Sequence, residues 1–191
     1  MYKIVYIKEK AKNLLLLGIS EEGESARYTV NLPLYEELGM PSVGHIITEG
    51  EMEIIRTADE EYRARKKALD LLALADNNRK NLKAKLLRAG FKKEICAMVV
   101  DEMAERGYVD ERGQIKRLVL REFAKKRGVR RITASLCAKG YSMSDINSSI
   151  RELCETEELD FSALRQQIIS SMKDEGHTAE EIKKYLYKQG F

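Results

Sequence analysis

The fold of this chain is decided by a stretch that it repeats, and the first copy is NRKNLKAKLLRAGF at residues 78–91. The second copy reads GVRRITASLCAKGY at residues 128–141, and the third reads TAEEIKKYLYKQGF at residues 178–191. The spacing stays at 50 residues throughout. A fixed period of this length is typical of stacked supersecondary units, so the sequence predicts repeated modules.

Each copy has the pattern of a short helix followed by a stop signal. Two apolar columns lie four residues apart and predict one buried stripe; they consist of Leu82, Ile132 and Ile182 and of Leu86, Leu136 and Leu186. A glycine follows each stripe at residues 90, 140 and 190, and an aromatic residue follows each glycine. Glycine accepts the positive φ of a helix C-terminus, and the next side chain can fold back onto the last turn. We interpret these columns as positions that build the fold and not as positions that contact a partner.

The regions around the repeat predict a mostly α-helical chain with a small sheet at its start. Alternation in residues 1–31 predicts two or three strands, with Tyr2, Ile4 and Tyr6 on one side and a hairpin turn around Gly23. We expect a β-rich extension with short helices at residues 1–57. Tandem three-helix modules should follow at residues 58–109 (module 1) and 110–159 (module 2), with an incomplete module of two helices at residues 160–191 (module 3). Because no linker separates them, we expect the modules to stack as an elongated array.

Capping patterns predict where the longer helices begin and end. Thr48 and Thr57 both begin capping-box patterns, and we expect the second to open a helix over residues 58–75. Asp110 is the predicted cap of a helix over residues 111–127, which closes at Gly128.

The composition indicates a soluble, cytoplasmic protein. The longest uninterrupted apolar run, residues 14–19, is far shorter than the roughly 20 residues that cross a bilayer. The N-terminus lacks the apolar core of a signal peptide. Cys96, Cys137 and Cys154 are odd in number and widely spaced, which argues against a disulfide framework or a zinc site and favours reduced packing residues.

Charge is distributed unevenly along the chain. Residues 61–140 contain 22 Lys and Arg against 10 Asp and Glu, whereas the rest of the chain contains 12 against 21. A basic block of this kind predicts an anionic partner, which would be nucleic acid or an acidic protein surface.

The densest cations lie on one predicted helix and at the start of the next. At about 100° per residue, Arg117, Arg121 and Lys125 form one row, and apolar residues 115, 119 and 123 form another on roughly the opposite side. A charged row is often only a solvated face, but its recurrence in modules 1 and 2 favours a binding surface. The candidate partner- or DNA-binding residues are Arg79, Lys80, Lys83, Lys116, Arg117, Arg121, Lys125, Lys126, Arg127, Arg130 and Arg131. Module 3 has Glu180 and Glu181 in the matching positions, so we expect the basic surface in modules 1 and 2 only.

Signatures of catalysis are missing from the sequence. His45 and His177 lie in different parts of the chain, and His177 has the setting of a turn residue. We find no metal-ligand cluster, nucleophile motif or glycine-rich phosphate loop. We therefore expect a non-enzymatic monomer without a cofactor.

The repeat resembles the RecX family of bacterial regulatory proteins, which modulate the recombinase RecA. The resemblance rests on ALDLLALADNNRKNLKAKLLRAGF (residues 68–91), ERGYVDE (residues 105–111) and KKRGVRRITASLCAKGY (residues 125–141). The chain departs from the family pattern at four positions in three places. Gln114 and Ile115 stand where an aromatic-alanine pair is usual, Val129 replaces a usual proline, and Asn78 replaces a usual serine cap. The first departure bears on the packing where modules 1 and 2 join.

The resemblance implies helical modules that lie in the groove of the RecA–DNA filament and bridge neighbouring protomers. Such a protein hinders filament growth and suppresses the recombinase and coprotease activities of RecA. The basic residues would then contact the phosphates of single- or double-stranded DNA or the acidic surface of the filament. Two other interpretations stay open: an autonomous helix-turn-helix-like transcription regulator that binds duplex DNA sequence-specifically, and a repeat scaffold that binds another protein independently of salt.

Overall fold

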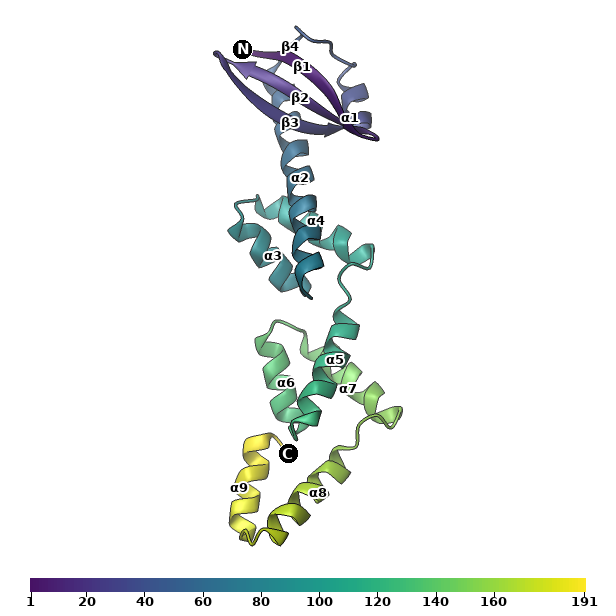
Figure 1. Ribbon diagram of the computed structural model, residues 1–191, viewed down its shortest axis with the longest axis vertical. Coiled ribbons are helices and arrows are strands. Elements are labelled where there is room, and N and C mark those ends of the chain that lie inside the picture. Colours follow the sequence, from purple (N-terminus) through teal and green to yellow (C-terminus); the bar gives the residue numbers. More distant parts are fainter. The chain divides into compact units, whose positions relative to one another are not determined.

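The computed structural model describes residues 1–191, which divide into two compact units. The first unit comprises residues 1–74 and 83–103, and the second comprises residues 75–82 and 104–191. The chain contains four strands and nine helices (Figure 1). One helix lies between the third and fourth strands, and the other helices follow the fourth strand. The predicted fold class, mostly helical with a small N-terminal antiparallel sheet, is therefore confirmed.

The sheet of the first unit contains one strand more than the sequence predicted. Its strands are β1 (Tyr2–Ala11), β2 (Leu14–Glu21), β3 (Glu24–Asn31) and β4 (Ile46–Ile47), and they pair antiparallel in the order β3-β2-β1-β4. The expected hairpin turn is present, with positive φ at Glu22 and Gly23. A register shift between Ile4 and Tyr6 interrupts the predicted alternation, so Ile4 is fully buried and Tyr6 only half-buried.

Helix α2 (Glu49–Leu74) covers this sheet and begins earlier than predicted. The capping box that opens it is the one at Thr48, where Glu51 accepts from the Thr48 backbone N–H at 2.8 Å. The expected start at Thr57 is wrong because the first two turns bury Met52 and Ile55 against the strands. Asp59 fixes the helix further, since its carboxylate accepts from the backbone N–H of Thr29 at 2.8 Å. The short helix α1 (Leu32–Glu37) is capped by Asn31, as its side chain accepts from Leu34.

The remaining helices follow the predicted repeat closely. They are α3 (Arg79–Arg88), α4 (Lys93–Glu105), α5 (Glu111–Ala124), α6 (Val129–Ala138), α7 (Met143–Glu155), α8 (Phe161–Asp174) and α9 (Ala179–Gln189). All six residues of the two apolar columns are buried. Gly90, Gly140 and Gly190 have φ of 90°, 96° and 92°, the left-handed conformation that the pattern predicts. The aromatic residue after each glycine donates its backbone N–H to the carbonyl of Leu86, Leu136 or Leu186, at 3.4, 3.2 and 3.1 Å.

Within the second unit, α5, α6 and α7 form a three-helix group around one core (Figure 1). Helices α8 and α9 form a second, smaller core with Ile168, Ile182 and Leu186. Helix α5 ends at Ala124 and not at the predicted Arg127, because Lys126 takes the left-handed conformation with φ 57°. Gly128 is consequently the N-cap of α6, with extended backbone, and does not close α5.

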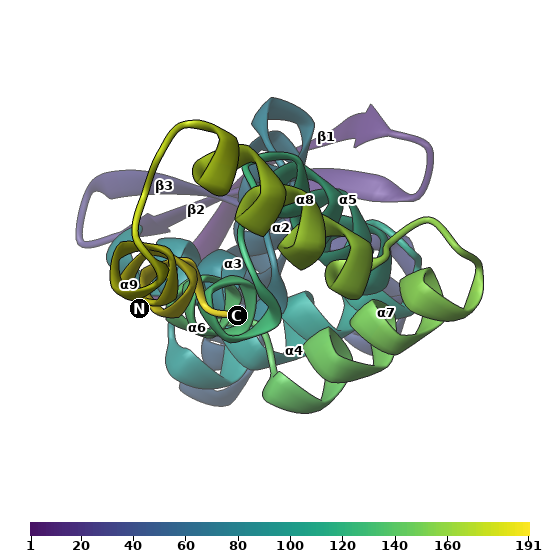
Figure 2. The same cartoon turned by 90° about the horizontal axis from the view of Figure 1, so that it is seen from below.

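In the second unit, the starts of two repeat helices, near Asn78 and Gly128, contact the end of the next repeat helix. The backbone N–H groups of Gly128 and Arg130 donate to the carbonyls of Gln189 and Gly190 at 2.8 and 3.2 Å, so α9 ends beside the start of α6 (Figure 2). Asn78 makes the equivalent contact, because its amide nitrogen donates to the carbonyl of Lys139 at 2.9 Å. Backbone N–H groups at Gly128 and Arg130, and the side-chain amide at Asn78, thus donate to the free carbonyls of another helix end. Gly128 permits this approach, since a Cβ there would lie 2.5 Å from the Gly190 backbone.

We predict that Gly90→Ala lowers the free energy of unfolding by about 1 kcal/mol, because alanine must adopt a positive φ there. A Cβ at Gly90 would meet no atom within 4 Å, so the loss reports backbone strain alone. Urea unfolding followed by circular dichroism measures the change. Gly50→Ala is the matched control: Gly50 lies in the first turn of α2 and is equally unobstructed, so alanine there should leave stability equal or higher. Equal effects of the two substitutions would contradict the left-handed cap.

Candidate nucleic-acid interface

Helix α5 presents the predicted basic row opposite its buried face. Ile115 and Val119 are fully buried. The side chains of Arg117, Arg121 and Lys125 are 58, 57 and 51% exposed. The amphipathic pattern therefore places three long cations in solvent while the same helix anchors the core of α5, α6 and α7.

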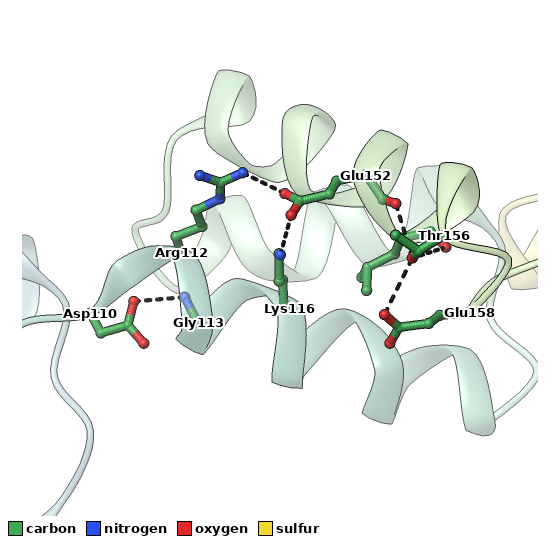
Figure 3. A network of polar contacts seen from close by, with 8 residues as sticks. Asp110, Arg112, Gly113, Lys116, Glu152, Thr156 and Glu158 are labelled. Carbon is green, nitrogen blue, oxygen red and sulfur yellow. Dashed lines mark hydrogen bonds and ion pairs between the residues drawn. The ribbon is translucent and has the colours of Figure 1, made fainter.

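The N-terminal half of this helix is neutralised by carboxylates. Arg117 lies 2.9 Å from the Asp76 carboxylate and 3.9 Å from that of Asp110. Arg112 and Lys116 both donate to Glu152 of α7, at 2.6 and 2.5 Å (Figure 3). Hydrogen bonds from Lys116 and then Arg112 lower the pKa of the Glu152 carboxyl. Lys116 and Arg117 therefore hold neighbouring segments together in this structure.

The C-terminal half of α5 keeps a net positive charge. Glu122 is buried, with its side chain 3% exposed, and it is the carboxylate that three cations share. Lys125 lies 3.2 Å and Arg121 3.9 Å from it, and Arg127 forms a close ion pair with it. One negative charge among three positive ones leaves an excess of two. Glu122 thereby fixes the cations in place without cancelling them.

Lys139 adds a fourth cation that the sequence did not indicate. It is the C-cap of α6, and its pKa is lowered first by burial and then by Arg121, Lys125 and Arg127. We name these four cations the basic cluster. The only sequence signal for Lys139 is its place immediately before Gly140, where modules 1 and 3 have Ala89 and Gln189. It was missed because α5 and α6 bring it to the basic row from a different helix.

A cavity of about 430 Å³ opens beside the basic cluster. Arg117, Arg121 and Lys139 line it together with Gln114, Tyr141 and Asp76. Gln114 is buried, accepting from the Tyr141 hydroxyl at 2.8 Å and donating to the Asn77 carbonyl at 3.3 Å. Burial raises the pKa of Tyr141, which keeps this hydroxyl a neutral donor. The departure from the family pattern at Gln114 thus forms a polar network in the second unit.

The remaining candidate cations lie outside the basic cluster and have other contacts. Arg130 stacks over Tyr187, with 4.9 Å between the guanidinium carbon and the ring centroid, and donates to the Phe191 carbonyl. Arg131 donates to the Lys188 carbonyl and to the Gln189 side chain, so both arginines take part in the contact between α6 and α9. Lys126 and Lys80 are exposed. The backbone N–H of Arg79 donates to Glu111, and Lys83 is half-buried in the first unit.

The histidines and cysteines of the chain lie outside any metal-binding group. No group of three His, Cys, Asp or Glu residues is arranged to hold a metal ion. The three cysteines are free thiols; Cys96 is buried, Cys137 half-buried and Cys154 exposed. His177 is exposed and lies 3.7 Å from Glu175 and from Glu181, in the turn that the sequence predicted. None of the helices combines the length and the apolarity that a membrane span requires.

Comparisons with known proteins find similarity to regulatory proteins named RecX. The chain is 26% identical over 125 residues to the regulatory protein RecX of Chlorobium limicola, covering 65% of this chain and 79% of that protein. It is 28% identical over 152 residues to the regulatory protein RecX of Clostridioides difficile, covering 78% and 71%. A crystal structure of a regulatory protein RecX superposes with a TM-score of 0.71 at 18% identity, covering all of this chain and 95% of the other. No protein-family model matches the sequence.

Removing the charge of Glu122 tests its place among the cations. We predict that Glu122→Gln lowers the free energy of unfolding by about 1–2 kcal/mol, because Arg121, Lys125 and Arg127 then repel one another without a shared carboxylate. Most of this cluster is half-exposed, which limits the loss. Urea unfolding followed by circular dichroism measures it. Glu155→Gln, which removes a charge from an exposed site on α7, should change stability by much less; equal losses would contradict the assigned role of Glu122.

Proposed function

We propose that this chain is a member of the RecX family and a non-enzymatic regulator of homologous recombination and the SOS response that acts on RecA, because the relatives that it resembles are regulatory proteins RecX. It binds the RecA–DNA filament and inhibits filament extension, ATP hydrolysis, strand exchange and coprotease activity. The observation that supports this proposal beyond the likeness to those proteins is the basic cluster, in which three cations share one buried carboxylate and Lys139 lies near the same three cations.

The physical argument for a polyanionic partner is that this positive charge is held in place. Arg121 and Lys125 are more than half exposed, yet each lies within 4 Å of Glu122, which limits the conformations that binding must fix. The charged form of Lys139 is destabilised first by burial and then by the three neighbouring cations, and an approaching phosphate would relieve the repulsion between the cations. We assign the phosphate contacts to these residues and to exposed Lys126.

The other candidate cations have a different part in the proposal. Lys116 and Arg117 are committed to carboxylates of the same unit, and Arg130 and Arg131 to the end of α9. They contribute to the electrostatic potential that draws a filament in, and they keep the basic cluster on a rigid support. Reversal of their charge would therefore disturb the fold as well as the binding.

We predict that the triple variant Arg121→Glu, Lys125→Glu and Lys139→Glu loses inhibition of RecA-driven ATP hydrolysis and strand exchange. The reversed charges repel DNA phosphate and the acidic surface of the filament. Both activities are measured with purified RecA on single-stranded DNA, and circular dichroism verifies that the helices are retained. The matched control reverses three exposed cations outside the cluster, Lys66, Lys67 and Arg151, and should inhibit as the natural chain does. Full inhibition by the first triple would remove the cluster from the interface.

The salt dependence of binding provides a separate prediction. Each phosphate that a cation neutralises on duplex DNA contributes about 0.9 to the slope of log K against log salt. The neutral variant Arg121→Gln, Lys125→Gln and Lys139→Gln should therefore lose about two to three units of slope. Capture on RecA filaments, bare single-stranded DNA and bare duplex at several salt concentrations measures it. A footprint on one defined operator without RecA would favour a helix-turn-helix regulator, and tight capture independent of salt would favour a protein scaffold.

A further inference from the structure

The cavity beside the basic cluster combines charged and neutral groups. Two cations of the cluster, Arg121 and Lys139, line it together with three neutral side chains, which are Gln114, Leu118 and Tyr141. Its volume of about 430 Å³ lies within the range of about 300–1,000 Å³ that is typical of small-molecule sites. Every lining residue belongs to the second unit. The cavity can therefore hold a ligand that has both an anionic and a neutral part.

The two cations in the lining suit an anionic group. Asp76 is the one carboxylate in the lining, and it is paired with Arg117 at 2.9 Å. Arg121 lies 3.9 Å from Glu122, beyond hydrogen-bond distance. Burial and cationic neighbours lower the pKa of Lys139, so an anion beside it would stabilise its charged form. A phosphate group would supply negative charge and acceptor oxygens to both cations.

A hydrogen-bonded pair, Gln114 and Tyr141, supplies polar groups to the neutral part of the lining, and we name it the polar pair. The Tyr141 hydroxyl donates to the Gln114 carbonyl oxygen at 2.8 Å, and the Gln114 amide nitrogen donates to the Asn77 carbonyl at 3.3 Å. An amide nitrogen has two N–H groups and a phenol oxygen has lone pairs, so the polar pair keeps a donor and an acceptor for a ligand. A nucleobase has donors and acceptors on its edge, and its faces stack on aromatic rings. The neutral part of the cavity therefore suits a nucleobase.

The repeat shows that the fold itself does not require these polar groups. The positions of the polar pair hold Ala64 and Phe91 in module 1, and Leu164 and Phe191 in module 3. Leu164 and Phe191 pack against the core of α8 and α9, so an apolar pair builds the same junction. The positions of the two cations are also uncharged in the other modules; they hold Leu71 and Ala89 in module 1, and Ser171 and Gln189 in module 3. The cations and the polar pair thus occur together in one copy only, as expected for the two halves of one site.

We propose that this cavity binds one nucleotide, with its phosphate at Arg121 and Lys139 and its base against Leu118 and the polar pair. The nucleotide is either a free nucleoside monophosphate or an unpaired nucleotide of single-stranded DNA, which have the same chemistry. In the second case the proposal rests on the proposed function, since the basic cluster then holds the strand by its phosphates. A base inside a duplex is paired and stacked, and it does not enter such a cavity.

The first test titrates the natural full chain with thymidine monophosphate, deoxyribose phosphate and inorganic phosphate, and follows the backbone amide signals by NMR. We expect the nucleotide to bind at least about fivefold more tightly than deoxyribose phosphate, because one base stacked on an aromatic ring contributes at least that factor. The largest shifts should fall at Leu118, Lys139 and Tyr141. Equal affinities for the three compounds would reveal a site for phosphate alone and would overturn the proposal, as would shifts confined to residues outside the lining.

A second titration separates the two sources of the nucleotide. It compares a short oligothymidylate, an abasic strand with the same number of phosphates, and a duplex. Tighter binding of the strand that has bases would identify single-stranded DNA as the source, whereas a base preference for the free nucleotide only would identify a nucleoside monophosphate. If every DNA binds alike and the free nucleotide shows no preference, the cavity proposal is overturned and the basic cluster keeps its assigned function. If no DNA binds but the free nucleotide does, the assigned function of the basic cluster fails and the cavity proposal stands.

The double variant Gln114→Leu and Tyr141→Phe gives the cavity the apolar pair of module 3 and leaves every cation in place. It should bind thymidine monophosphate about threefold or more weakly, because the hydrogen bonds to the base are lost, and should bind inorganic phosphate as the natural chain does. Gln166→Leu with Tyr185→Phe makes the same two changes outside the lining and should leave both affinities unchanged. Unchanged nucleotide affinity in the first variant would overturn the proposal. Circular dichroism verifies its helices, and the titration of the natural chain decides the proposal if this variant does not fold.

Discussion

The structure depends on the left-handed glycine that closes each repeat helix. Gly90, Gly140 and Gly190 have a positive φ, and the next backbone N–H donates to the carbonyl of the buried leucine. This hydrogen bond ties the end of the helix to the residue that anchors its apolar stripe. The direction in which the chain leaves the helix is therefore coupled to the packing of the core. A side chain at these positions would strain the backbone in the conformation that makes both possible.

The same helix ends provide the contacts between successive repeats in the second unit. A helix terminus leaves carbonyls or N–H groups without partners. Here the carbonyls after α9 accept from Gly128 and Arg130, and the carbonyl of Lys139 after α6 accepts from Asn78. Opposite partial charges of the helix dipoles meet at these points. The same hydrogen bonds thus satisfy the polar groups at the helix ends and attach one repeat to the next.

Most of the fold could be predicted because its determinants are local. The glycine columns and the cap at Asp110 act within a few residues of their position, and each has the predicted structure. The predictions were wrong where contacts between residues distant in the sequence determine the structure. Helix α2 starts at the earlier of two equivalent capping boxes because the sheet buries Met52 and Ile55. Gly128 is required by the approach of the Gly190 backbone, a neighbour distant in the sequence, and not by the end of α5.

The candidate site was less predictable because counting charges along a helix does not reveal which of them are compensated. The sequence places Arg117 and Arg121 in one row, yet Arg117 faces two carboxylates and Arg121 shares a single one with two other cations. Residues outside the row determine whether a cation in the row is compensated. Asp76 precedes α3, and Lys139 ends α6. Burial of Glu122 then gives it a role that no exposed glutamate could have, because a carboxylate shielded from solvent holds three cations in place and leaves their excess charge facing outward. A surface that attracts a polyanion is in this way built around a buried negative charge.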